Sequence, residues 1–154
     1  MYARILLDGR GVPANAREAR LWFGRAARSG VLDAQVALGE MLVNGRGGEA
    51  SPEKALTVFR HAASKGHAGA MFALGLLHAN GHGLPANPAA AQKWFMAAAK
   101  RGHGQAELMM GRYLSKGLGG EYDPAAGRIW LERAAAHGID EAEEELAELA
   151  LAQG

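Results

Sequence analysis

The sequence predicts an all-α solenoid, an array of helical hairpins that repeats every 36 residues along the 154-residue chain. Three sets of positions recur at this interval without a gap. One is a glycine, another is a pair of alanines just before it, and the last is a Leu-Gly or Met-Gly pair in the following unit. The glycines are Gly30, Gly66, Gly102 and Gly138, the alanine pairs begin at Ala26, Ala62, Ala98 and Ala134, and the last set begins at Leu38, Leu74 and Met110.

The later helix of each hairpin is predicted by apolar residues on one helical face. In one copy Ala91, Trp94, Phe95 and Ala98 recur at i, i+3, i+4 and i+7. We expect the tryptophan and phenylalanine columns to fill the space between successive hairpins. Polar residues at a 36-residue spacing are the expected N-caps, and a proline follows three of them at the first helical position. These N-caps are Asn15, Ser51, Asn87 and Asp123.

The earlier helix of each hairpin ends at a second glycine column, Gly45, Gly81 and Gly117. A glycine-rich connector of about seven residues, such as 45–51, leads to the later helix. A phosphate-cradling loop is one interpretation of such a segment. Its fourfold repetition with capping residues behind it favours a structural turn instead.

The pattern predicts nine helices in one array. We expect a partial unit at 1–30, full units at 31–66, 67–102 and 103–138, and a C-terminal capping helix within 139–154. The expected helices are 2–8, 16–29, 32–44, 52–65, 68–80, 88–101, 104–116, 124–137 and 140–152.

The repeated residues carry a family resemblance. Leu-Gly-x-x-[Leu/Tyr]-x-x-Gly-x-Gly, then Pro-x-x-Ala, then aromatic-x-x-Ala-Ala-x-x-Gly resembles the Sel1-like repeat, which is related to the tetratricopeptide repeat, and residues 73–102 are the clearest copy. The resemblance implies a right-handed α/α superhelix that acts as a scaffold or adaptor in bacterial protein complexes. The alternative is a regulatory or targeting segment of a larger, multidomain protein with an enzymatic part.

Composition narrows the function classes further. No apolar run approaches the roughly 18 residues that span a bilayer, so membrane insertion is not expected. The chain has no cysteine, which excludes disulfides and thiolate sites. The first thirteen residues lack the apolar core of a secretory signal, and the compartment stays open between cytoplasm and periplasm.

No catalytic, metal or cofactor site is expected. His78 and His82 are four residues apart, but Gly81 ends the helix between them and His78 stands in a leucine column. The serines have no repeat-placed carboxylate partner. Residues 1–30 carry six arginines, and the last four of them, from Arg17 to Arg28, spread around a helix. This favours a solvated face over a phosphate track, so nucleic acid is not an expected partner.

The expected binding surface is the concave face formed by the first helices, by resemblance to the tetratricopeptide groove. An apolar column there favours a partner helix or extended peptide, and packing of this column against adjacent helices is the alternative. Phe72 is the preferred hot spot. The candidate residues are Val36, Glu40, Val43, Asn44, Phe72, Leu76, Asn80, Leu108, Arg112 and Lys116.

The two ends of the array are expected to differ. Residues 1–30 carry six bases against two acids, whereas residues 139–154 carry six acids and no base. The first repeat, residues 1–30, is truncated. The apolar face of its second helix, with Trp22 and Phe23, is therefore expected to be incompletely covered. We therefore expect the chain either to continue N-terminally in its natural context or to self-associate through residues 1–30.

Overall fold

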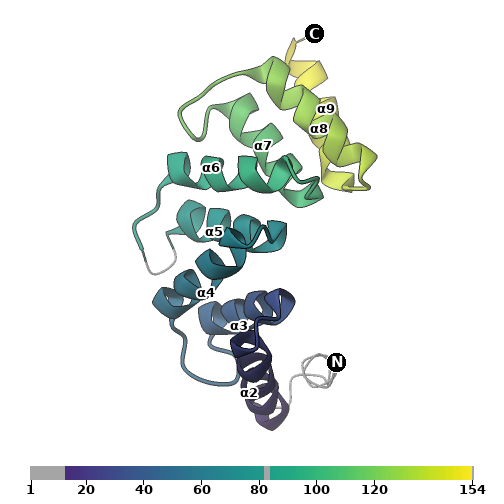
Figure 1. Cartoon of the computed structure of the whole chain (residues 1–154). Coiled ribbons are helices and arrows are strands. Elements are labelled where there is room, and N and C mark those ends of the chain that lie inside the picture. The colour runs from purple at the N-terminus through teal and green to yellow at the C-terminus, as the bar shows by residue number, and fades with distance from the viewer. Residues whose placement is uncertain (1–12, 82–83, 154) are drawn as a thin grey trace. The chain divides into compact units, whose positions relative to one another are not determined.

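A computed structural model describes residues 13–81 and 84–153 (Figure 1). These residues form eight helices and no strand, which confirms the all-α prediction, and the expected helix at 2–8 lies outside the described residues. The helices are α2 (Pro13–Arg28), α3 (Leu32–Asn44), α4 (Pro52–Ser64), α5 (Ala68–Asn80), α6 (Pro88–Ala99), α7 (Gly104–Lys116), α8 (Pro124–Ala136) and α9 (Asp140–Gln153).

Three of the four expected N-caps are present. The side chains of Ser51, Asn87 and Asp123 each accept a hydrogen bond from the backbone N–H three residues later, and a proline follows each. The expectation for Asn15 is wrong, because it lies inside α2. That unit has its helix-starting proline at Pro13, so the helix begins earlier than in the other units.

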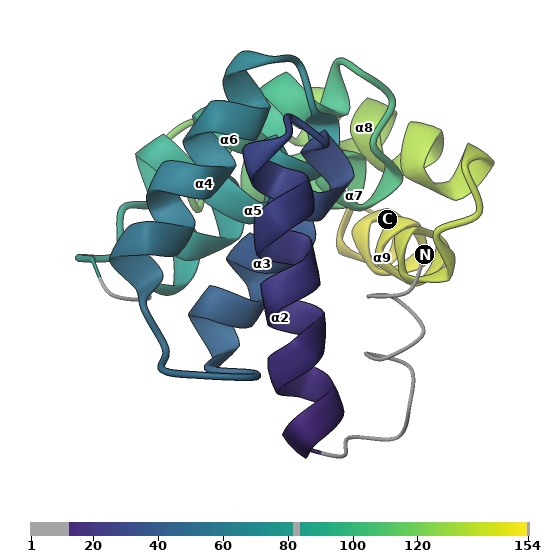
Figure 2. The same cartoon turned by 60° about the horizontal axis from the view of Figure 1, so that its bottom comes forward.

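The described residues divide into two compact units, 13–70 with 84, and 71–81 with 85–153. In the first unit α3 packs against both α2 and α4 (Figure 2). The Phe59 ring on α4 lies over Gly39 on α3 and is 1% exposed. A Cβ at Gly39 would stand 2.5 Å from Phe59 Cε1, so the glycine makes room for the ring.

The second unit repeats this packing. The Phe95 ring lies over Gly75, and the Leu131 side chain lies over Gly111. Tyr113 meets Phe95 edge-on at 5.3 Å between ring centroids, and burial raises the pKa of the Tyr113 phenol.

The aromatic column of the second helices differs from the expectation. Phe59 and Phe95 are 1% and 0% exposed, whereas Trp94 is only half-buried and Trp22 is 44% exposed. The phenylalanine position faces the hairpin's own first helix, and the neighbouring tryptophan position is displaced by one residue, about 100° around the helix. The core therefore rests on the phenylalanine column.

The glycine-rich connectors fold back on the preceding second helix. The Arg20 guanidinium on α2 donates hydrogen bonds to the backbone carbonyls of Arg46 (3.3 Å) and Glu49 (2.8 Å). Gly47, with φ of +74°, lies directly against the backbone of Ala16. These contacts agree with a structural turn.

In the parts of the chain that the structure describes, no helix combines the length and apolarity needed to cross a membrane.

Candidate interaction surface

In the first compact unit, the candidate binding residues lie on α3, the first helix of its hairpin. We call the candidate residues of a first helix its stripe. Val36 and Val43 are half-buried, and Glu40 and Asn44 are exposed. Val36, Glu40 and Asn44 are four residues apart, so they lie on one face of α3. This face presents two partly covered aliphatic groups beside a carboxylate and an amide.

The stripe of the second unit begins on α5 with Phe72, Leu76 and Asn80 at the same spacing. Phe72 is half-buried, because its ring stacks on the His103 ring at 4.8 Å and meets the Phe95 ring at 5.7 Å. Leu76 is half-buried, and Asn80 is exposed at the end of the helix. Phe72 therefore supports the core as well as the surface, and Leu76 is the better probe of a binding role.

On α7, the equivalent residues are less available to a partner than on α3 and α5. Leu108 is 1% exposed within a cluster that includes Leu131 and Ala142, so it cannot touch a partner. For Leu108 the packing alternative holds, because the last helix, α9, supplies the cover. Arg112 forms an ion pair with Glu145 of α9, whereas Lys116 is exposed.

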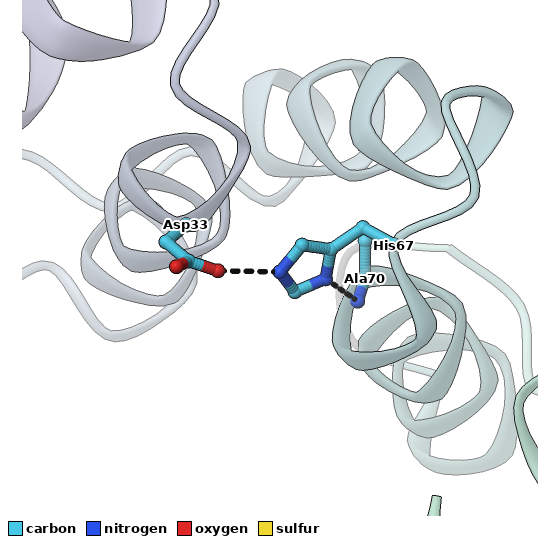
Figure 3. A network of polar contacts seen from close by, with 3 residues as sticks. All are labelled: Asp33, His67 and Ala70. Atoms are coloured by element: carbon cyan, nitrogen blue, oxygen red, sulfur yellow. Dashed lines mark hydrogen bonds and ion pairs between the residues drawn. The ribbon is translucent and has the colours of Figure 1, made fainter. Parts of the chain in front are cut away.

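The sequence analysis missed the role of two equivalent histidines. His67 Nδ1 accepts a hydrogen bond from the Ala70 N–H (3.1 Å), and its Nε2 lies 2.7 Å from Asp33 Oδ1, as Figure 3 shows. Because Nδ1 accepts the hydrogen bond from the Ala70 N–H, Nε2 is the ring nitrogen that can donate to Asp33. His103 caps α7 in the same way through the Ala106 N–H (3.2 Å).

A buried carboxylate was also missed. Glu107 on α7 is 2% exposed, and its Oε1 lies 2.5 Å from Nδ1 of His137, the residue that follows α8. A buried carboxylate requires a hydrogen-bond partner, and His137 supplies one. The bond therefore ties α7 to the end of α8. The position is polar in the first unit too, where Gln35 stands.

These polar residues do not gather into a reactive centre. Within the described ranges no group of three or more histidine, aspartate or glutamate side chains could hold a metal ion. His67 and His103 cap helices, and His137 ties α7 to the end of α8. Within each unit, the first helices carry partly covered apolar groups beside exposed amides and charges. Binding surfaces combine groups of these kinds.

Comparisons with solved structures support the architecture. A Sel1 repeat protein from Oxalobacter formigenes is 28% identical, with a TM-score of 0.79 over 84% of this chain and 52% of that one. The protective antigen c5321 of uropathogenic Escherichia coli, which displays an SLR fold, is also 28% identical, with a TM-score of 0.86 over 96% of this chain.

A Sel1 repeat protein from Klebsiella pneumoniae is 23% identical, covering 97% of this chain and 76% of its own, and its TM-score of 0.63 shows the shared fold alone. The chain spans about half the length of the Oxalobacter protein and 32% of the E. coli antigen. No curated protein matches the chain significantly. The solenoid fold class is confirmed.

The family follows from the sequence model of the Sel1 repeat. That model matches residues 1–31, 32–67, 68–103 and 104–139, so each of its later units begins one residue after the expected boundary. Sel1 repeats are generally protein–protein interaction modules and are typically not catalytic. With four consecutive matches, this chain belongs to the Sel1 repeat family.

Proposed function

We propose that this protein is a non-catalytic scaffold whose first helices hold a peptide or protein segment of a binding partner. The observation that carries the proposal is the incomplete burial of aliphatic side chains on otherwise well-packed helices. Val36 and Val43 on α3, and Leu76 on α5, remain partly exposed, although helix packing buries their neighbours. Covering them with a partner's apolar groups would contribute about 25 cal/mol per Å².

Exposed amides add directionality to this surface. Asn44 and Asn80 each end a first helix, and each carries two N–H donors and an acceptor oxygen. An extended peptide backbone presents matching groups, and so does the end of a helix. Lys116, at the equivalent position of α7, offers a charge for a carboxylate instead.

The proposed surface is smaller than the one expected from the sequence. Leu108 is removed by its burial, and Arg112 is committed to Glu145. The direct contacts that we propose are Val36, Glu40, Val43 and Asn44 on α3, Leu76 and Asn80 on α5, and Lys116 on α7.

The test is a comparison of two aspartate variants. Leu76→Asp places a carboxylate in the proposed surface, and we expect at least a tenfold loss of affinity for any partner recovered with the wild-type chain. Ile129→Asp is the matched control, since Ile129 on α8 is 53% exposed and outside the surface. Equal partner recovery by both variants, with both folded by circular dichroism, would overturn the proposal.

A further inference from the structure

The first unit contains a pocket of about 580 Å³ on its second-helix side, between α2 and α4, with α3 at its base. We call it the α2–α4 pocket. Leu38, Leu42 and Val58 form an apolar floor, and Leu21, which is 63% exposed, lies at its rim. The volume lies within the range of pockets that bind ligands.

In this pocket, α2 has a glycine where the other second helices have long side chains. Gly24 lines the pocket, and a Cβ at this position would meet no atom within 4 Å. The equivalent residues of α4, α6 and α8 are Arg60, Met96 and Glu132. Unlike Gly39, Gly24 makes room for no neighbouring ring and has no positive φ, so packing does not explain it.

The ionisable residues that line the pocket are all basic. Arg17, Arg28 and Lys54 are exposed side chains of the lining, and His61 and Arg20 also contribute to it. The lining has no acidic residue, and within the described residues Arg17, Arg28 and Lys54 form no ion pair. Clustered charge of one sign in a concave site attracts an anionic ligand.

A buried amide side chain also lines this pocket. Gln35 lines the pocket and is 4% exposed; its Nε2 donates to the Ala27 carbonyl at 3.2 Å. Its Oε1 is buried and, among the described residues, accepts no hydrogen bond. The equivalent Glu107 is paired with His137. A ligand with an N–H donor would satisfy the Gln35 oxygen.

We propose that the α2–α4 pocket binds an acidic segment of a partner protein that carries one apolar anchor side chain. The anchor occupies the floor at Leu38 and Val58, carboxylates pair with Arg17 and Arg28, and a backbone N–H bonds to Gln35 Oε1. A single nucleic-acid strand would meet the same charges, but the floor is aliphatic and lacks the aromatic platform on which bases stack. This site is independent of the first-helix surface.

Peptides selected from a random display library on the folded chain test the proposal. We expect enrichment of sequences with acidic residues around one large apolar residue, and binding that weakens with added salt. Gly24→Met fills the pocket with the residue that α6 has there, and replacing glycine within a helix favours folding. We expect this variant to melt at a higher temperature yet to bind the selected peptides at least about tenfold more weakly.

Charge variants keep the test falsifiable if Gly24→Met perturbs the fold. Arg17→Glu with Arg28→Glu should lose the peptides, whereas the charge-matched control, Arg60→Glu with Lys65→Glu, should retain them. Leu76→Asp should also retain them, which separates this site from the proposed scaffold surface.

Three results would overturn the proposal. The first is selection without acidic enrichment, and the second is retention of the peptides by Gly24→Met. The third is binding of another occupant that Gly24→Met abolishes. That occupant would be single-stranded RNA, bound without any peptide, or the acidic α9 of a second copy, seen as self-association in sedimentation.

Discussion

Replacing Gly39 or Gly24 of the first unit with alanine should change the free energy of unfolding in opposite directions. At Gly39 an added Cβ would stand 2.5, 2.6 and 2.9 Å from three ring atoms of Phe59, whereas ordinary contacts are about 3.4–4 Å. The ring is 1% exposed and cannot swing into solvent. Overpacking of this kind costs about 1–3 kcal/mol. Replacing a helical glycine with alanine returns about 1 kcal/mol. We therefore expect Gly39→Ala to destabilise by up to about 2 kcal/mol.

Gly24→Ala carries the same gain in helix propensity without the clash, because nothing lies within 4 Å of its Cβ. We expect it to stabilise by about 0.5–1 kcal/mol. Thermal and urea unfolding of the two single variants measures the difference. A double variant with Phe59→Ala provides the internal check, since removing the ring should make Gly39→Ala neutral or stabilising. Equal stabilisation by both single variants would refute the packing of Phe59 over Gly39.

Three further stability measurements probe individual contacts. Phe95→Ala should cost about 3–5 kcal/mol and Trp94→Ala clearly less, because only Phe95 is fully buried; urea unfolding with the order reversed would contradict this. His67→Ala should cost about 1 kcal/mol by removing an N-cap, and His67→Asn should recover most of it; a melting curve in which asparagine gives no recovery would show that capping is unimportant. His137→Ala leaves the Glu107 carboxylate buried without its partner and should cost about 1–2 kcal/mol, a loss that Glu107→Gln in the same background should reduce.

Local chemistry explains which features the sequence could predict. The bounds of α3, α5 and α7 agree with the expected 32–44, 68–80 and 104–116, because glycines fix the helix ends. The N-caps at Ser51, Asn87 and Asp123 are equally local. Asn15 was predicted wrongly because Pro13, outside the 36-residue register, starts the helix first.

Burial and polar partners depended on tertiary contacts that no local pattern encodes. Leu108 and Phe72 share a column, yet α9 covers the former and His103 stacks on the latter. The cap at His67 was hidden because Val31 and Ile139 occupy the same column, so the repeat does not mark it as polar. The opening at Gly24 is an absent side chain, which becomes a pocket only when its neighbours are known.

The central claim, that the first helices hold a partner, can be tested most directly by site-specific photo-crosslinking in cells that produce the protein naturally. A photoreactive amino acid replaces Asn44 or Asn80 on the proposed surface, and Ile129 on α8 as the control, all of them exposed positions. We expect both surface positions to form a covalent adduct with the same protein and the control to form none with it. Adducts at Ile129 alone, or different proteins at the two surface positions, would contradict the proposed scaffold surface.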